Sequence, residues 1–386
     1  MVSIRRATPY HAFSMPKHIY IAYTGGTIGM KRSGAGWRPA PGFLAEQMAE
    51  MPELTAPGMP TYEIHEFEPL LDSSNMTPQG WISIARQIDE NYFKEYDGFI
   101  VLHGTDTMAY TASALAMFLV ELDKPVIMTG SQIPLCQARN DARENLVTAL
   151  QIAGDDQAPK EVCVYFNDLL LRGCRTTKMD CDGFGAFASP NVEPLGKIGV
   201  YFEYRVAFNR HLYREHGAAS LEAPPGAAIT AAGSDEYARV AALRLYPGIS
   251  IELLRAASAP PIQGLVLECF GLGNGPDRDR EFIEALTAAA ERVAIVDVTQ
   301  CPSGSVYLGN YATGAAMKSA GVIPCADLTT EAALAKLFYL FQLGLSLDQV
   351  RTIMPLDIRG ELTGPAFVVP PGATGLEPVM RRARPA

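Results

Sequence analysis

The feature that most constrains the fold of this chain is a regular alternation of short apolar, β-rich runs with longer helical patterns. Between residues 18 and 167, strands are predicted at 18–23, 61–71, 98–104, 124–130 and 161–167, and helices at 77–92, 107–121 and 139–153. Strands that alternate with helices favour a parallel sheet with right-handed crossovers. The sequence therefore predicts an α/β domain with a flavodoxin- or Rossmann-like parallel sheet.

A second α/β unit follows a break in this rhythm. Residues 205–238 are rich in Ala, Pro, Gly and Ser, a composition typical of a linker. Beyond them, strands are predicted at 242–246, 264–270 and 293–299, and helices at 249–257, 279–290, 313–320 and 330–343. We therefore predict an N-terminal extension (1–17), a larger N-terminal α/β domain (18–204), the linker (205–238) and a smaller C-terminal α/β domain with a tail (239–386).

The composition argues against two classes of partner. The net charge is −10 with no basic stripe, so neither nucleic acid nor an anionic membrane is an expected partner. No apolar stretch approaches the ~20 residues of a membrane span, and the N-terminus lacks the apolar run of a signal peptide. The seven cysteines are odd in number and dispersed, which indicates buried, reduced thiols. These features predict a cytoplasmic location.

Polar residues gather directly after the predicted strands, where open parallel sheets bind their ligands. The segments concerned are TGGT (24–27), DSS (72–74), HGTD (103–106), TGS (129–131) and ND (167–168). Hydroxyl residues and glycines also cap helices routinely, so one such turn means little. Together they predict a site for a small polar ligand, with carboxylates available for an ammonium group.

Several common catalytic motifs do not occur in the chain. Thr24 stands where a dinucleotide fingerprint requires glycine, and neither a phosphate-binding loop nor a G-x-S-x-G elbow is present. The histidines lack the spacing of a zinc site, and His103 is interpreted as a packing residue or one behind the site. A hydroxyl nucleophile remains, Thr27 or Thr105, which needs another hydroxyl or a lysine of lowered pKa as its base. Lys178 is a candidate for that lysine.

The chain resembles the L-asparaginase family in several blocks. The family's signature blocks are matched by TGGTIG (24–29), HGTDTMAYTASAL (103–115) and TGSQIP (129–134). Similarity to the bacterial cytoplasmic, or type I, subtype lies in DSSNMTP (72–78), FGAFASPN (184–191) and GVIPCADLTTEA (321–332). The resemblance runs from about residue 18 to about residue 365, and Met15 is an alternative start. It implies a two-domain amidohydrolase that forms a homotetramer, a dimer of dimers, and uses no metal or organic cofactor.

The resemblance also implies which residues hydrolyse L-asparagine to L-aspartate and ammonia. Thr27 would be the nucleophile that attacks the side-chain amide. Thr105, Lys178 and Asp106 would relay protons, and Asp106 would also receive the substrate ammonium group.

Further residues are implied in substrate binding. Ser73 and Ser74 would hold the substrate α-carboxylate, and Asp72 is assigned to the same site. Backbone amides near Thr105 and at the turn containing Gly26 would stabilise the oxyanion. Asn274 resembles a residue that enters the site of a neighbouring subunit.

Two departures from the family pattern lead to expectations about the activity and the kinetics. Trp37 stands where a loop tyrosine is expected to help activate the nucleophile, so we expect activity below family norms, and Tyr23 is interpreted as a packing residue. Thr177 and Cys301 match a second, activating asparagine site, but Glu268 stands where an arginine is expected. A carboxylate would repel the effector, so hyperbolic kinetics are expected.

Two alternatives stay open. One is the asparaginase-like subunit of a tRNA-dependent amidotransferase, which carries an extra N-terminal module, whereas about 17 residues precede the first strand here. The other is a catalytically silent amino-acid sensor on the same fold. The intact Thr27, Thr105, Asp106 and Lys178 argue against the sensor.

Overall fold

The chain forms two compact units, Met1–Phe208 and Asn209–Ala386. The computed structural model describes residues 3–7, 17–34, 36–206, 237–308 and 312–365. Most of the predicted linker therefore lies outside the described residues, as do residues 1–2 and 8–16 of the predicted extension and the tail from residue 366.

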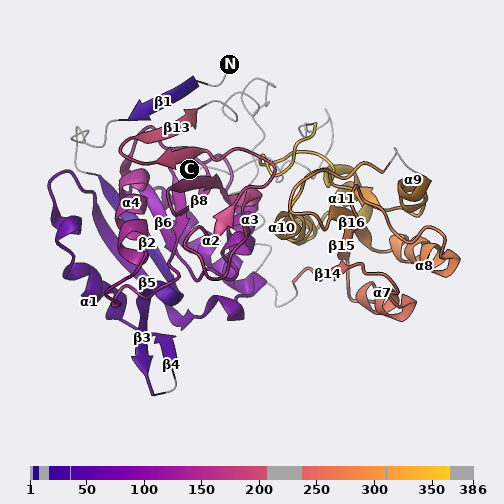
Figure 1. The fold of residues 1–386 in the computed structure, drawn as a ribbon, viewed down its shortest axis with the longest axis horizontal. Helices are drawn as coiled ribbons and strands as arrows, with labels where there is room; N and C mark the ends of the chain where they lie inside the picture. Colours follow the sequence, from indigo (N-terminus) through magenta and orange to yellow (C-terminus); the bar gives the residue numbers. More distant parts are fainter. Residues whose placement is uncertain (1–2, 8–16, 35, 207–236, 309–311, 366–386) are drawn as a thin grey trace. The chain divides into compact units, whose positions relative to one another are not determined.

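Unit 1 is built on a nine-stranded sheet in the order β1-β13-β12-β9-β8-β7-β6-β2-β5 (Figure 1). Its strands are β1 (Ser3–Ala7), β2 (His18–Gly25), β5 (Thr61–Leu71), β6 (Gly98–Leu102), β7 (Val126–Thr129), β8 (Val162–Phe166), β9 (Leu169–Arg172), β12 (Gly196–Ile198) and β13 (Phe202–Val206). Strands β5, β2, β6, β7 and β8 are parallel neighbours. Numbered by their order along the chain, these five strands lie across the sheet in the order 2-1-3-4-5, as in flavodoxin-like folds. The predicted α/β class is confirmed.

The other half of this sheet is antiparallel, a feature that the sequence analysis did not predict. Strand β9 pairs antiparallel with β8, β12 with β9, and β13 with both β12 and β1. The turn from β8 to β9 is Asn167-Asp168, and both residues have positive φ. Such a turn is typical of a tight hairpin, which needs no crossover helix. The polar pair at 167–168, predicted as part of the ligand site, therefore closes a hairpin.

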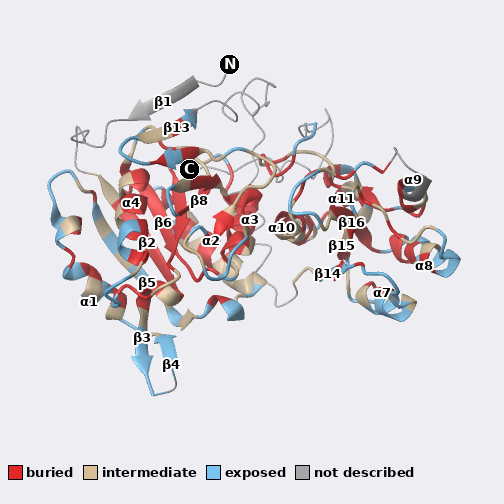
Figure 2. Ribbon diagram, viewed as in Figure 1, coloured by how far each residue is buried: buried red, intermediate tan, exposed pale blue. Residues whose placement is uncertain are grey.

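Among the described residues of unit 1, four helices and several short elements accompany the sheet. The helices are α1 (Phe43–Ala49), α2 (Pro78–Tyr92), α3 (Met108–Phe118) and α4 (Ala142–Gly154). The short elements are the strand pairs β3 (Met30–Ser33) with β4 (Gly36–Pro39) and β10 (Thr177–Lys178) with β11 (Phe187–Ala188), and the 3-10 helices η1 (Thr27–Gly29), η2 (Pro52–Thr55), η3 (Ser73–Asn75) and η4 (Gly173–Arg175). Strands β6, β7 and β8 are buried throughout, because helices cover both sheet faces (Figure 2).

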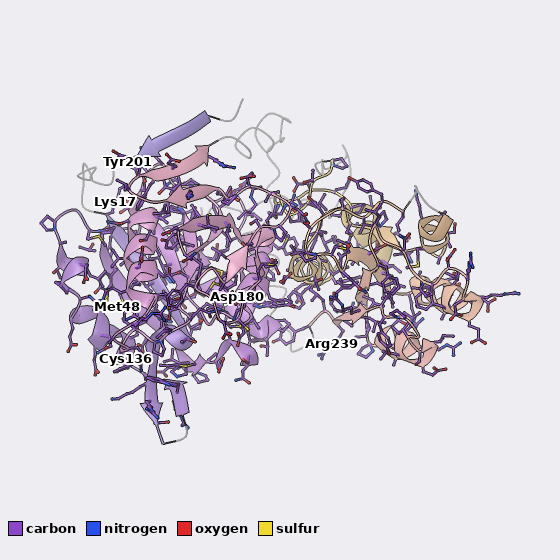
Figure 3. All side chains as sticks on the ribbon, viewed as in Figure 1. Lys17, Met48, Cys136, Asp180, Tyr201 and Arg239 are labelled. Carbon is purple, nitrogen blue, oxygen red and sulfur yellow. The ribbon has the colours of Figure 1, made fainter. Side chains whose placement is uncertain are left out.

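Ion pairs anchor the N-terminal end of β2. Lys17 Nζ lies 3.1 Å from Asp97 Oδ1 and 2.9 Å from Asp156 Oδ1, and its side chain is 17% exposed (Figure 3). The backbone N–H of His18 donates to Asp97 Oδ2. Lys17, the last residue of the predicted extension, thus holds the start of the first parallel strand.

Unit 2 contains a four-stranded parallel sheet in the order β14-β15-β16-β17. Its elements are β14 (Val240–Arg244), β15 (Gly264–Cys269), β16 (Ala294–Thr299), β17 (Ile323–Pro324), α7 (Ile251–Ala257), α8 (Arg280–Ala290), α9 (Ala312–Ser319), α10 (Thr330–Gln342) and α11 (Leu347–Ile353). The predicted second α/β unit is confirmed, although β17 and α11 were not predicted. Within the described ranges, every helix is too short or too polar to cross a lipid bilayer.

The cysteine prediction holds in part. None of the seven cysteines, all of which lie in the described residues, forms a disulfide, and four of them are buried. Cys136, Cys181 and Cys301 are exposed, so the expectation of burial is wrong for these three.

A buried carboxyl group lies in the core of unit 2. Asp297 on β16 is fully buried, and neither of its oxygens accepts a well-formed hydrogen bond, although the Cys269 thiol lies beside it. Burial raises the pKa of Asp297 to about 7. A Cβ on Gly273 would stand 2.6 Å from Asp297 Oδ2, so this carboxyl group lies directly under the turn that carries Asn274.

Asp297→Asn is expected to stabilise the protein at alkaline pH. Because the pKa is higher in the folded state than in the unfolded state, the wild type loses stability as pH rises from about 4 to about 7. The full difference in pKa corresponds to up to about 4 kcal/mol, and the amide does not titrate. Urea unfolding of both proteins at about pH 5 and about pH 8 measures the effect. An equal stability difference at both pH values would contradict it.

Candidate active site

Three strand ends meet at one point of the parallel sheet. Strand β2 lies between β5 and β6, and this is where the strand order reverses, the usual ligand position in such sheets. The Gly26 N–H donates to Leu71 O at the end of β5. A Cβ on Gly26, whose φ is +87°, would stand 2.4 Å from the backbone nitrogen of Gly104 after β6. The turn after β2 therefore touches both neighbours, which explains the need for glycine.

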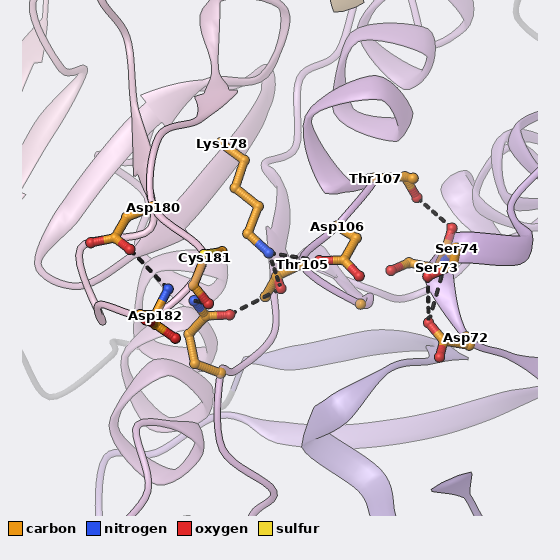
Figure 4. A network of polar contacts seen from close by, with 12 residues as sticks. Asp72, Ser73, Ser74, Thr105, Asp106, Thr107, Lys178, Asp180, Cys181 and Asp182 are labelled. Carbon is orange, nitrogen blue, oxygen red and sulfur yellow. Dashed lines mark hydrogen bonds and ion pairs between the residues drawn. The ribbon is translucent and has the colours of Figure 1, made fainter. Parts of the chain in front are cut away.

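Lys178 joins the second hydroxyl and the carboxylate predicted for the site. Its Nζ donates to Thr105 Oγ1 at 2.9 Å and to Asp106 Oδ1 at 2.7 Å (Figure 4). The Lys178 side chain is 17% exposed, Thr105 is buried, and the Asp106 side chain is 62% exposed. Lys178 lies on strand β10, where it pairs with Phe187 of strand β11. The structure thus brings together three predicted residues from two distant parts of the chain.

The segment after β5 forms the other side of the same region. Asp72 Oδ1 accepts hydrogen bonds from the backbone N–H and the hydroxyl of Ser74 (Figure 4). The Thr107 hydroxyl donates to Ser73 O, and a Cβ on Gly104 would stand 2.5 Å from Ser73 Oγ. Ser73 is buried and Ser74 is exposed. Both serines therefore lie beside the turn that carries Thr105.

Thr27 is the first residue of η1, directly after the glycine turn. It is partly exposed, and the part of the chain that the structure describes offers its hydroxyl no hydrogen-bond partner. Its hydroxyl is therefore available to an incoming group.

Gln132 was missed by the sequence analysis, although it lies in the TGSQIP block. The Thr105 hydroxyl donates to Gln132 Oε1 at 3.0 Å. The backbone N–H of Gln132 in turn donates to both carboxylate oxygens of Asp141, just before α4, at 3.1 and 2.9 Å. A glutamine after a strand carries no distinct sequence signal, so only its contacts identify it.

The interpretation of His103 as a residue behind the site agrees with the structure. Its ring is fully buried, and Nδ1 lies 2.7 Å from Gly104 O while Nε2 lies 3.0 Å from Thr111 Oγ1. Since a carbonyl can only accept, Nδ1 carries the hydrogen and Nε2 accepts. Burial lowers the pKa of His103 to about 4, so the ring is neutral. Among the described residues, no group of three or more His, Cys, Asp or Glu side chains is placed to hold a metal ion.

The segment predicted as a loop with Trp37 is half of a β-hairpin. Trp37 lies on β4 opposite Arg32 of β3, and its side chain is 40% exposed. The hairpin projects from unit 1 directly after η1 (Figure 1). Tyr23 is fully buried in the core, as predicted, and its hydroxyl lies so close to Gly29 that a Cβ there would stand 1.9 Å away.

The remaining candidates are divided between the two units. Thr177 lies on β10 in unit 1. In unit 2, Glu268 on β15 pairs with Arg244 of β14 at 3.0 Å, and Cys301 is exposed after β16. Asn274 exchanges backbone hydrogen bonds with Phe270 in a tight turn. The roles of these four residues stay predictions.

Two family models match the chain over most of its length. The model "Asparaginase, N-terminal" matches residues 18–212, and the model "Glutaminase/Asparaginase C-terminal domain" matches residues 239–354. The chain belongs to the asparaginase family. It is 46% identical to L-asparaginase 1 of Escherichia coli (strain K12) over 348 residues, which cover 90% of this chain and 98% of that protein.

Solved structures of asparaginases agree with this assignment. L-asparaginase I from Vibrio cholerae matches with a TM-score of 0.77 and 44% identity, covering 90% of this chain and all of that chain. A glutamyl-tRNA(Gln) amidotransferase component from Pyrococcus horikoshii is also similar, at 32% identity over 89% of this chain and 76% of its own length. The predicted resemblance to type I L-asparaginases is confirmed, as is the prediction of an asparaginase-type amidohydrolase.

Proposed function

We propose that this asparaginase hydrolyses the side-chain amide of L-asparagine to give L-aspartate and ammonia. The observation that carries the proposal is the position of Lys178 Nζ, within hydrogen-bond distance of both Thr105 and Asp106 at the point where the strand order reverses. An amine beside a hydroxyl is the arrangement that lets an otherwise weakly acidic alcohol move protons. The turn that carries Gly26 and Thr27 packs against Gly104, and the described residues leave the Thr27 hydroxyl without a partner, which suits acyl transfer.

In the proposed mechanism, Thr27 Oγ attacks the amide carbon and loses its proton to the relay. Backbone N–H groups of the turn at Gly26 and near Thr105 stabilise the oxyanion, each contributing a few kcal/mol. The C–N bond then breaks and ammonia leaves with the relayed proton. Water hydrolyses the resulting ester on Thr27 by the same route and releases L-aspartate.

The relay consists of Thr105, Lys178 and Asp106. Thr105 takes up the proton that Thr27 releases and passes it toward Lys178, and Asp106 Oδ1 holds Lys178 in place. Because the Asp106 side chain is largely exposed, its second oxygen is open to the substrate ammonium group. Ser73 and Ser74, beside the Thr105 turn, bind the substrate α-carboxylate.

Ammonia release from L-asparagine by the purified chain alone tests the proposal. Turnover without a partner or tRNA is the expected result. Release only in the presence of other subunits and tRNA would instead indicate an amidotransferase subunit. Binding of L-asparagine without turnover would indicate a sensor. L-Glutamine measured in parallel determines the substrate preference.

Trp37→Tyr is expected to raise kcat several-fold. The indole of Trp37 has only an N–H donor and cannot accept a proton from Thr27, whereas a phenol can both donate and accept. Trp37→Phe is the matched control and should change KM more than kcat if the ring only covers the site. Steady-state kinetics of the three proteins decide. An unchanged or lower kcat for Trp37→Tyr would mean that the phenol does not limit this enzyme.

The rate is expected to depend hyperbolically on L-asparagine concentration. Glu268 would repel the carboxylate of an effector, and the nearby cation Arg244 is already paired with Glu268. Initial rates over a wide range of L-asparagine concentration measure the curve. A sigmoidal curve would show that an activating site involving Thr177 and Cys301 survives.

Three further features are proposed on the family pattern. The enzyme acts as a homotetramer, a dimer of dimers, in which Asn274 enters the site of a neighbouring subunit. It is located in the cytoplasm and uses no metal or organic cofactor. Size-exclusion chromatography with light scattering tests the tetramer, and retention of activity in EDTA tests independence from metal.

A further inference from the structure

Gln132 occupies a central position behind Thr105. It follows β7, and its side-chain amide contacts two other parts of the site. Its Oε1 accepts the Thr105 hydroxyl at 3.0 Å, while its Nε2 donates to Cys181 O and Gly183 O, each at 3.2 Å. Cys181 and Gly183 belong to the loop that follows Lys178. One amide therefore connects Thr105 with the segment that carries the relay lysine.

The two carbonyl groups determine which way this amide faces. Carbonyl oxygens can only accept hydrogen bonds, so the Gln132 NH2 group must point at Cys181 and Gly183. Its oxygen must then face Thr105. A side-chain oxygen has no hydrogen to give, so the Thr105 hydroxyl has to donate to it.

The direction of the Thr105 hydrogen leaves one defined position for a ligand. A hydroxyl oxygen has one hydrogen and two lone pairs. In the resting arrangement, the hydrogen is held by Gln132, and one lone pair accepts from Lys178 Nζ at 2.9 Å. The described residues provide no further partner for this oxygen, so only a lone pair faces the ligand.

We infer that Gln132 is a positioning residue that holds Thr105 as a hydrogen-bond acceptor toward the substrate. This inference rests on the proposed function. An acceptor matches the NH2 group of an amide substrate, which carries hydrogens. It opposes the product carboxylate, which has none to donate. Gln132 thereby favours binding of the amide over binding of the acid that the reaction forms.

The position of Gln132 is itself rigidly supported. Asp141 accepts from the backbone N–H groups of Gln132 and Ile133 and from the Asn145 side chain. These contacts hold the start of the Gln132 side chain independently of its amide. A substitution that changes only the amide therefore leaves the surrounding backbone in place.

Gln132→Met tests the inference because it keeps the length of the side chain and removes both hydrogen-bonding groups. The freed Thr105 hydrogen can then turn toward the ligand. We expect kcat/KM for L-asparagine to fall roughly 10- to 100-fold and inhibition by L-aspartate to become stronger. A purely structural role would weaken substrate and product binding together. Inhibition that weakens in parallel with kcat/KM, or kcat/KM within twofold of wild type, would overturn the inference.

Gln132→Glu is the second variant, and its expected effect can be distinguished from a loss of folding. A protonated glutamic acid can donate to one loop carbonyl and accept from Thr105, whereas the ionised form cannot donate. Its kcat/KM relative to wild type should therefore rise as the pH falls from about 8 to about 5, while that of Gln132→Met stays constant. A flat ratio for Gln132→Glu would contradict the inference. A wild type that releases no ammonia would reject the proposed function as well, whereas an active wild type with unaffected variants rejects the inference alone.

Discussion

Thr27→Ala is expected to lower kcat by roughly 10³-fold or more, because removal of a nucleophile leaves only binding and oxyanion stabilisation. Thr27 lies directly after the glycine turn at the end of β2, with a hydroxyl that is not engaged within the described residues. The substitution also removes the Thr27 methyl group, which is only a small loss of buried surface. The fold and oligomeric state should therefore be unchanged. Ammonia release and size-exclusion chromatography measure both expectations.

Thr27→Ser is the matched control, since it keeps the hydroxyl and removes only the methyl group. It should retain far more activity than Thr27→Ala. If Thr27→Ala kept more than a few per cent of the wild-type kcat, Thr27 would not be the nucleophile, and Thr105 would be the next candidate.

Lys178→Met is expected to lower kcat/KM roughly 10²- to 10⁴-fold, the range of a positioned acid–base group. The methionine keeps much of the side-chain volume but removes the amine that contacts Thr105 and Asp106. Without that amine, no nitrogen lies beside Thr105 to receive a proton that Thr105 takes up. Steady-state kinetics with L-asparagine measure the loss.

Two control variants distinguish the loss of a proton relay from the loss of a positive charge. Lys178→Arg restores the positive charge beside Asp106, but a guanidinium does not deprotonate, so it should not restore activity. Lys17→Met removes another lysine that is 17% exposed and that pairs with two carboxylates at the opposite end of β2. It should leave kcat unchanged. Nearly normal kcat/KM for Lys178→Met would make Lys178 a structural residue.

The local parts of this protein could be predicted because their causes lie within a few residues. Short apolar runs predicted all the parallel strands except β17 to within about two residues. Thr77 followed by proline predicted the start of α2, where the Thr77 hydroxyl accepts from the Gly80 N–H. The positive φ of Gly25 and Gly26 explains why glycines follow β2. Hydrogen bonds and steric limits of this kind involve neighbours along the chain.

Contacts between distant residues required the tertiary structure. Lys178 and Thr105 are 73 positions apart, and only the strand order β2-β6-β7-β8 and the β10–β11 pair bring them together. The spacing of Lys178 resembles that of any exposed lysine, and the TGSQIP block does not indicate that its glutamine contacts Thr105. Their partners are set by the order of strands in the sheet, which an apolar pattern does not encode.

The sequence by itself therefore determined the two α/β units, the polar strand ends and the family resemblance. The tertiary structure alone decided the antiparallel half of the large sheet, the hairpin that carries Trp37, the burial of Asp297 and the direction of the Thr105 hydrogen bond. Burial and hydrogen-bond direction depend on every group that packs around a side chain in three dimensions. Neighbours in the sequence supply only a small part of that environment.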